Sequence, residues 1–299
     1  MITLAILAVI VRVTTPILLS GIGTLYNDRA GVTNITVEGS MLLGAFASVA
    51  CSYFTHNWVL SVLVAVLCGI LVSLLFSLLT TVLNGVEIIV GLAMNVFLDG
   101  LTVFLLRQVF KQSGSLYSPE IVGIPTFSFE GLNNIPVLNE CLNGQTWIVY
   151  FAFLSVVLSQ IVLFHTPFGM KVRACGENPN AAATVGINVP RIRLICNIIA
   201  GSMCGLAGAQ LSLGFLSLFS EGMTVGKGYI ALAAVIFSKG KPARVLSLSL
   251  FFGLAEALSN TLQLTAIPPE LALMLPYVTV ILLTLLEFKK KPSAHHPAN

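Results

Sequence analysis

The sequence predicts an all-α fold, a polytopic membrane protein with about eight to ten transmembrane helices that include a discontinuous or re-entrant segment. Composition is the first observation behind this fold class. Hydrophobic residues make up 56% of the 299 residues and charged residues only 9%, whereas a soluble domain carries about 25% charged residues. The second observation is a mean hydropathy of +0.95, which implies more apolar surface than one soluble core can bury. The third is that apolar residues gather in runs of about 20, the length that crosses a bilayer.

The apolar runs follow one another along the chain. The first run, 2–25, lacks the small-residue cleavage site of a signal peptide and is therefore interpreted as a span. Further spans are predicted at 35–55, 58–83, 85–106, 145–165 and 194–217. The segment 222–238 is short and interrupted by glycines, which favours a re-entrant or discontinuous helix. The last two spans are predicted at 243–265 and 270–288.

The polar stretches between the runs predict the orientation. Residues 166–193 and the tail 289–299 are basic, and Lys and Arg concentrate on the cytoplasmic side of membranes. Both are therefore expected to be cytoplasmic. Residues 107–144 carry only Arg107 and Lys111 as basic residues and are rich in Pro, Gly, Asn and Ser. This segment is predicted to be an extracytoplasmic loop of a transmembrane domain that covers 1–288.

The charged stretch 169–193, GMKVRACGENPNAAATVGINVPRIR, contains a short predicted helix. Asn178 is a favourable N-cap, Pro179 suits the first helical position, and Gly186 can end the helix. A helix this short is marginal by itself and needs a surface to pack against. On local grounds alone, an ordinary cytoplasmic loop with one helical turn is an equal alternative.

Polar residues within the apolar runs form two patterns. Asn95 and Asp99 are four residues apart and share a helix face, and Glu256, Asn260 and Gln263 share another. Because ionisable groups at membrane depth are unfavourable in lipid, they usually face a bundle interior or water. The two stripes could line a hydrated path for a polar solute, or they could hydrogen-bond neighbouring helices.

Asn34 and Glu38 mark the predicted start of the second span. Asn34 could cap that helix, and a carboxylate at Glu38 would be stabilised by the positive end of the helix dipole. The alternative is that Glu38 stands at a broken helix beside a transport path. Further along, Gly201, Gly205 and Gly208 lie on one face and predict a close helix–helix contact.

Signals of an enzyme or a metal site are missing from the sequence. It contains no HExxH, no GxSxG, no Gly-rich Walker loop and no spaced His/Cys cluster. The six cysteines contain no CxxC pair and are expected to be free thiols. The chain is expected to be a non-catalytic subunit without a cofactor or metal of its own, and its +3 net charge gives no indication of nucleic-acid binding.

Three stretches, 27–48, 169–193 and 226–258, together carry a resemblance to a known family. They are similar, in the family's order, to the permease subunits of binding-protein-dependent ABC importers for simple sugars, nucleosides and branched-chain amino acids. The nucleoside and simple-sugar type is the most similar, and the likeness covers nearly the whole chain except the loop 107–144. The family's first motif is usually closer to Leu-Asn-Ile-Gly-Leu-Glu-Gly, and Thr33, Thr36 and Val37 depart from it here.

The resemblance implies that the charged stretch is a coupling helix that docks on an ATPase subunit. On this basis the residues expected to make or shape the contact are Phe168, Gly169, Arg173, Glu177, Asn178, Pro179, Ala182 and Gly186. Such a partner would supply the surface that the short helix lacks. The candidate substrate path comprises Asn34, Glu38, Asn95, Asp99, Glu256, Asn260 and Gln263.

The resemblance further implies an ATP-driven importer of a nucleoside or simple sugar in the cytoplasmic (inner) membrane. Its expected partners are an ABC ATPase that binds ATP and Mg, an extracytoplasmic solute-binding protein and a second permease subunit, either a related chain or another copy. The departure in the first motif leaves an amino-acid-type solute as an alternative. A secondary transporter or channel working alone is a further alternative, and a polytopic membrane enzyme is the third.

Overall fold

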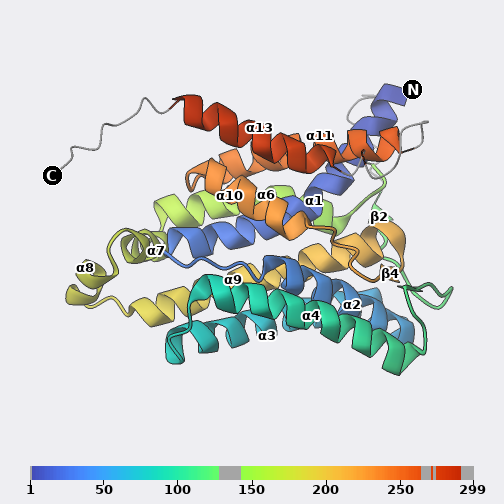
Figure 1. Cartoon of the computed structure of the whole chain (residues 1–299), viewed down its shortest axis with the longest axis horizontal. Helices are drawn as coiled ribbons and strands as arrows, with labels where there is room; N and C mark the ends of the chain where they lie inside the picture. Colours follow the sequence, from blue (N-terminus) through green and yellow to red (C-terminus); the bar gives the residue numbers. More distant parts are fainter. Residues whose placement is uncertain (1, 128–142, 264–270, 272–273, 291–299) are drawn as a thin grey trace.

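A computed structural model describes residues 2–127, 143–263, 271 and 274–290 of the chain. The predicted outer-loop residues 128–142 and the tail from 291 lie outside the described residues. The described part is a helical bundle in which most helices run along one long axis (Figure 1). Seven helices in this part are long and apolar enough to cross a membrane, which agrees with the predicted fold class.

The helices lie close to the predicted runs. In chain order they are α1 (Ile2–Arg29), α2 (Val37–Thr55), α3 (Trp58–Ser77), α4 (Glu87–Phe110), α6 (Trp147–His165), α7 (Pro167–Glu177), α8 (Pro179–Thr184), α9 (Val189–Ala209), α10 (Lys227–Ser238), α11 (Pro242–Leu262) and α13 (Leu275–Lys290). Helix α3 continues as the π-helical turn η1 (Leu78–Val82), and α9 continues as η3 (Gln210–Leu216).

Three differences from the predicted boundaries have local causes. Helix α1 continues past residue 25 to Arg29, because the Arg29 side chain in its polar last turn donates to the Gly240 carbonyl of another element. Helix α13 includes Lys289 and Lys290, which were predicted to open the tail. Helix α7 was not predicted, because its sequence has the composition of a polar loop although it buries one face.

Four two-residue strands lie at the end of the bundle opposite α7 and α8 (Figure 1). Strand β1 (Ser115–Leu116) pairs antiparallel with β4 (Phe219–Ser220), and Leu116 is the partner of Phe219. Strand β2 (Thr126–Phe127) pairs antiparallel with β3 (Gln145–Thr146). These pairs join the segment after α4 to the segments before α6 and α10.

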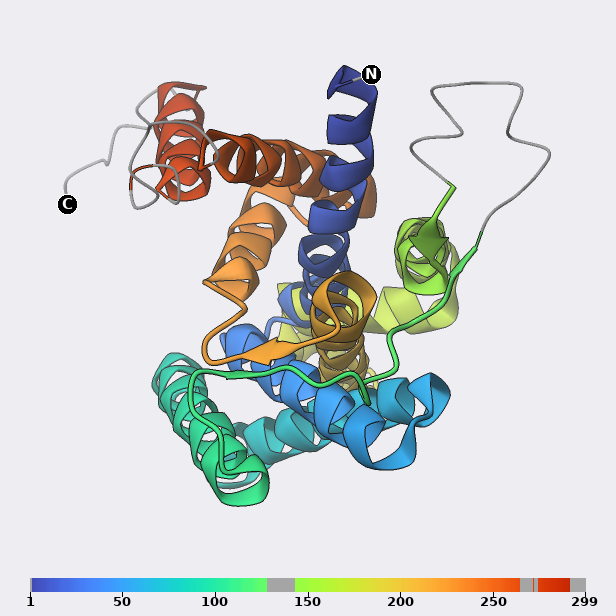
Figure 2. The same cartoon turned by 90° about the vertical axis from the view of Figure 1, so that its right-hand side faces the viewer.

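Helix α9 runs through the middle of the bundle, with α1 on one side and α2 and α3 on the other (Figure 2). Its glycines allow backbone contact. Gly201 lies against the carbonyl of Gly69, Gly205 against that of Ala65, and Gly208 against that of Met41. A side chain at any of the three would occupy the position of another helix's backbone. The predicted close helix–helix contact is therefore confirmed.

Helix α10 has only 12 residues, about 18 Å at a rise of 1.5 Å per residue. It packs between α1 and α11 and occupies the part of the bundle nearer to α7 and α8 (Figure 1). Its first residue consequently lies inside the bundle rather than at an end. The short helix predicted within 222–238 is confirmed. The N-terminus of α10 faces the interior of the bundle.

Candidate functional site

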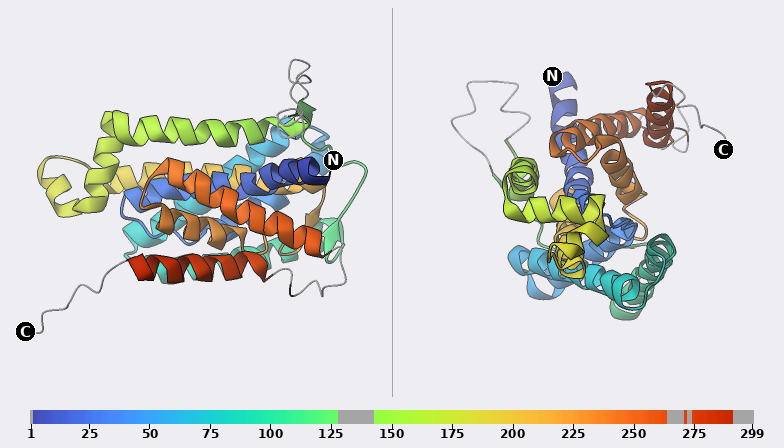
Figure 3. Two further views of the ribbon diagram at one scale, coloured as in Figure 1. Left: turned by 90° about the horizontal axis from the view of Figure 1, so that it is seen from above. Right: turned by 90° about the vertical axis from the view of Figure 1, so that its left-hand side faces the viewer.

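The first candidate site is the α7–α8 hairpin, which projects beyond the other helices (Figure 3). Asn178 is the N-cap of α8, and its Oδ1 accepts a hydrogen bond from the Ala181 N–H at 3.0 Å. Pro179 occupies the first turn, and Gly186 follows the helix with a φ of +82°. The local structure expected for this stretch is confirmed, with the helix ending at Thr184.

Helix α7 anchors this hairpin to the bundle. It buries Gly169, Val172 and Cys175, and Gly169 lies directly against the carbonyls of Val162 and Leu163 in α6. Burial raises the pKa of the Cys175 thiol, and the nearby Arg193 guanidinium opposes that shift. One face of α7 is thus part of the core, which fixes the hairpin to packed helices.

The predicted coupling residues divide into two groups by exposure. Glu177, Asn178 and Gly186 are exposed, whereas Gly169 and Ala182 are buried and the other three, Phe168, Arg173 and Pro179, are half-buried. The sequence interpretation missed two exposed apolar side chains on this hairpin, Val185 at 75% and Met170 at 60% exposure. An apolar residue in a polar loop is the signal that could have identified them.

Arg29, at the end of α1, connects the hairpin to α10. Its Nε donates to the Gly240 carbonyl at 2.9 Å, just beyond the end of α10. Its guanidinium also lies 5.7 Å from the centre of the Phe164 ring in α6, and Arg173 of α7 lies 5.2 Å from the same ring. These cation–π contacts place α1, α6, α7 and α10 in one cluster that the sequence did not predict.

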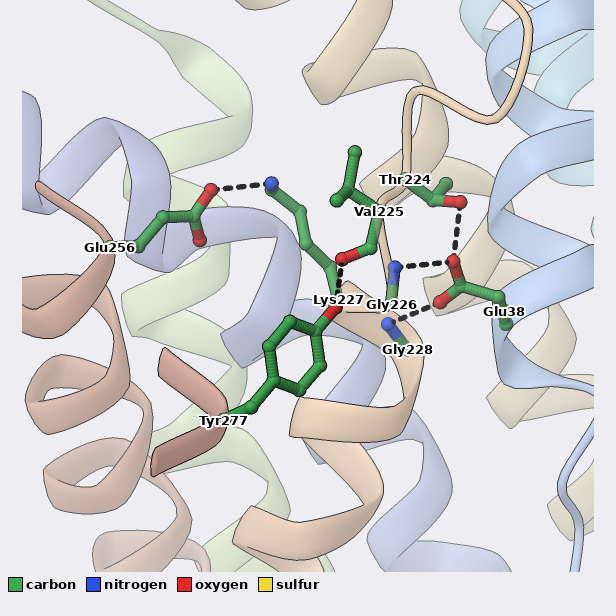
Figure 4. Close-up of polar contacts among 8 residues, drawn as sticks. All are labelled: Glu38, Thr224, Val225, Gly226, Lys227, Gly228, Glu256 and Tyr277. Atoms are coloured by element: carbon green, nitrogen blue, oxygen red, sulfur yellow. Dashed lines mark hydrogen bonds and ion pairs between the residues drawn. The ribbon is translucent and has the colours of Figure 1, made fainter. Parts of the chain in front are cut away.

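The second candidate site surrounds the start of α10, where Glu38 has a different partner from the one expected (Figure 4). Its carboxylate accepts hydrogen bonds from the Thr224 Oγ1 at 2.5 Å, the Gly226 N–H at 2.9 Å and the Gly228 N–H at 2.7 Å. The negative charge therefore caps α10, not only the helix α2 to which Glu38 belongs. The alternative of a role at a broken helix describes this geometry better than local capping.

Asn34 does not cap α2. The N-cap is Thr36, and the Asn34 Oδ1 instead accepts from the Thr36 N–H and Oγ1. Asn95 is also occupied, since its Oδ1 accepts from the Gly39 N–H and its Nδ2 donates to the Ile35 carbonyl and the Tyr229 hydroxyl. Asn34 and Asn95 thus shape the junction between α2, α4 and α10 by hydrogen bonding.

Asp99 does not join this junction. Asn95 is buried at 6% exposure, but Asp99 is exposed on the outer face of α4. The two residues share a helix, yet the structure does not bring their side chains to one site.

The opening of α10 has an unusual backbone. Val225 has a φ of +44° and Gly226 a φ of +73°, and a β-branched residue with positive φ is strained. The Tyr277 hydroxyl of α13 donates to the Val225 carbonyl at 2.6 Å, and a side chain at position 226 would collide with that hydroxyl. Tyr277 and Glu38 therefore hold this segment from opposite sides (Figure 4).

Lys227 and Glu256 form an ion pair inside the bundle, and the other Glu256 oxygen, Oε2, is buried without a hydrogen-bond partner in the described part of the chain. Two cavities of about 160 Å³ each flank this pair. One lies among α10, α11 and α13, and Gln263 and Tyr277 line it. The other lies among α1, η3 and α11, and Arg12, Gln210 and Phe215 line it. Asn260 lines both.

The structure thus brings Glu256, Asn260 and Gln263 together around cavities, as their spacing suggested. Lys227 and Arg12 also belong to this site, and the sequence interpretation assigned neither of them to it. An ionisable residue within an apolar segment was the available signal.

Comparison with known proteins gives consistent matches. The sequence profile of the family described as branched-chain amino acid transport system / permease component matches residues 6–284. The guanosine ABC transporter permease protein NupQ of Bacillus subtilis (strain 168) is 34% identical over 297 residues, which cover 93% of this chain and 91% of the relative. The nucleoside ABC transporter permease protein NupC of Lactococcus lactis subsp. cremoris (strain MG1363) is 36% identical over 284 residues, which cover 91% and 88%.

Two further matches extend the comparison. TsgC13 of Haloferax volcanii, a permease protein assigned to glucose ABC transport, is 35% identical over 295 residues, which cover 91% of this chain and 88% of the relative. A solved structure of an ABC transporter assigned to the metal-chelate type, in an inward-facing conformation, has a TM-score of 0.53 and 16% identity. The match covers 95% of this chain and 85% of the other, so the two share a fold.

Proposed function

The chain belongs to the family of branched-chain amino acid transport system permease components, and from this premise we propose that it is the permease subunit of an ATP-driven importer of a nucleoside or simple sugar. It is a multi-pass protein of the cell membrane. The relatives named for guanosine, nucleoside and glucose transport support the choice of solute.

The observation that carries the proposal is the α7–α8 hairpin. It is a short capped helix that projects from the bundle (Figure 3), presents Val185 to solvent and is anchored through α7 to α6 and α1. A separate ABC ATPase that binds ATP and Mg would seat on this hairpin. An extracytoplasmic binding protein would deliver the solute at the opposite end, and a second permease subunit would complete the path.

The experiment compares two Asn caps at the same end of the molecule. Asn178→Ala removes the cap of α8, and Asn188→Ala removes the cap of α9, where the Asn188 Oδ1 accepts from the Arg191 N–H at 3.1 Å. Each cap contributes about 1 kcal/mol. The six-residue α8 depends on its cap far more than the 21-residue α9 does, because α9 is packed along its length.

In proteoliposomes with the ATPase and binding protein, Asn178→Ala should lower solute-stimulated ATP hydrolysis several-fold, whereas Asn188→Ala should retain it. Equal retention by both variants would contradict the coupling role. Uptake that needs no ATP would instead favour a transporter working alone, and ATP-dependent uptake of leucine rather than guanosine or glucose would favour an amino-acid permease.

A further inference from the structure

The two cavities beside α10 share a wall. Lys227, Glu256 and Asn260 line both of them, and the first two form the ion pair described above. Each cavity of about 160 Å³ is smaller than a usual ligand pocket, but together they provide about 320 Å³, within the range of about 300–1,000 Å³ that ligand pockets occupy. The ion pair therefore separates two cavities whose combined volume is that of a ligand pocket.

Both cavities combine polar and apolar side chains, but the individual groups differ. The cavity beside α13 is lined by groups that bond hydroxyls, among them the amide of Gln263 and the Tyr277 hydroxyl. The cavity beside η3 is lined by Phe215, Leu211 and Met223, and also by the polar side chains of Arg12 and Gln210. An aromatic ring and apolar side chains suit the face of a planar heterocycle. The cavity beside α13 thus offers groups that bond hydroxyls, and the cavity beside η3 offers apolar side chains for the face of a heterocycle and Arg12 and Gln210 for its polar edge.

The ion pair is not explained by stability alone. Burying two charges is opposed by their desolvation, so a buried pair adds little net stability over apolar residues of similar size. Both side chains are mostly buried, at 12% and 13% exposure. The Glu256 Oε2 is left without a partner in the described residues, and a buried carboxylate oxygen without a donor is unfavourable. A ligand that supplies hydroxyl donors would satisfy it.

We infer that the Lys227–Glu256 pair is a removable partition in the solute site, and that the solute has two parts, an aromatic heterocycle joined to a ring with adjacent hydroxyls. This deepens the proposed function and rests on it, because it selects a nucleoside over a simple sugar. The hydroxyls donate to the Glu256 carboxylate, which accepts hydrogen bonds only, while the heterocycle lies against Phe215. As the solute enters, one hydroxyl donates to the unpartnered Oε2 and another takes the place of the Lys227 ammonium on Oε1, while the ammonium donates in exchange to acceptor oxygens of the solute.

The test measures the ratio of the uptake rates of two solutes, because this ratio does not depend on how much active protein is present. The complete transporter is reconstituted with its ATPase and binding protein, and ATP-dependent uptake is measured for adenosine and for 2′,3′-dideoxyadenosine. The wild-type protein should prefer adenosine. Glu256→Gln should lower that preference about tenfold or more, because an amide offers one acceptor oxygen where the carboxylate offers two. Glu120→Gln removes an exposed carboxylate that lines neither cavity and should keep the preference.

A charge-reversed pair separates recognition from structure. Lys227→Glu with Glu256→Lys retains an ion pair but moves the carboxylate from α11 to α10. If the pair only stabilises the bundle, this double variant should keep both uptake and preference. If Glu256 binds the hydroxyls, the variant should assemble and lose the preference. This second protein also keeps the inference testable if Glu256→Gln does not fold.

The outcomes distinguish this inference from the proposed function on which it rests. Wild-type uptake of adenosine with unchanged preference in Glu256→Gln and in the reversed pair would overturn the inference and leave the importer in place. Wild-type uptake of glucose that adenosine does not compete with would also overturn it. No ATP-dependent uptake of adenosine or glucose by the wild-type complex would overturn the proposed function, and this inference with it.

Discussion

Glu38 shows how one side chain can serve two helices. It belongs to the first turn of α2, yet its carboxylate accepts three hydrogen bonds from the segment that opens α10. The start of α10 lies within the bundle, and its part-buried N–H groups have no helical acceptor and need another one. A carboxylate is the strongest acceptor for this purpose, because it also complements the positive end of the helix dipole.

The first prediction concerns Glu38. Glu38→Ala should lower the free energy of unfolding by about 2–4 kcal/mol, because hydrogen bonds to a charged acceptor contribute about 1.5–3 kcal/mol each and removal leaves part-buried N–H groups unpaired. Thermal unfolding of the detergent-solubilised protein would measure this change. The control is Glu87→Ala, which removes a carboxylate that accepts one bond from the Thr33 N–H in an exposed position. Equal effects of the two substitutions would contradict the capping role.

At the scale of elements, α9 determines how closely the bundle packs. Three glycines on this helix touch the backbones of α3 and α2, and such contacts bring helices closer than larger residues permit. In a membrane this packing has to replace the hydrophobic effect, because lipid chains are as apolar as the helices themselves. The close approach along α9 is therefore a principal source of stability for the bundle.

The second prediction concerns these contacts. Gly205→Ala should destabilise the bundle by about 1–3 kcal/mol, because the added Cβ would meet the Ala65 carbonyl and backbone cannot rearrange as a side chain can. Gly100→Ala on α4 is the matched control, since nothing lies within 4 Å of a Cβ there. It should be neutral or stabilise by up to about 1 kcal/mol from helix propensity. Urea unfolding monitored by circular dichroism would compare the two, and comparable losses would contradict the packing explanation.

At the scale of the whole molecule, a continuous set of contacts joins the projecting hairpin to the ion pair. Helix α8 is attached to α7, and Gly176 of α7 lies against the Arg29 carbonyl. Arg29 binds the carbonyls beyond the end of α10, and Lys227 is the first residue of α10. A displacement of the hairpin would therefore move α10, which is about 18 Å long. The opposite end of α10 carries Lys227 of the Lys227–Glu256 ion pair.

The third prediction tests this connection. Arg29→Lys keeps the charge but loses the planar fork that contacts two carbonyls and the Phe164 ring. Solute uptake per ATP hydrolysed should fall roughly tenfold, within the usual range of coupling energies between sites, while ATP hydrolysis continues. Arg191→Lys, exposed at the same end of the molecule, should leave the ratio unchanged. An unchanged ratio in Arg29→Lys would show that force reaches α10 by another route.

The sequence by itself determined the membrane class, the positions of the long helices, the short α10 and the capped α8, but not helix α7. These depend on local composition and on hydrophobic run length, which neighbouring residues define. The packing role of Gly201, Gly205 and Gly208 also followed from their spacing alone. The hydrogen-bond partner of Glu38, the separation of Asn95 from Asp99 and the pairing of Lys227 with Glu256 were decided only by the tertiary structure. These three features depend on how each helix is rotated about its axis and how deep it lies in the bundle. The packing of the whole bundle sets both.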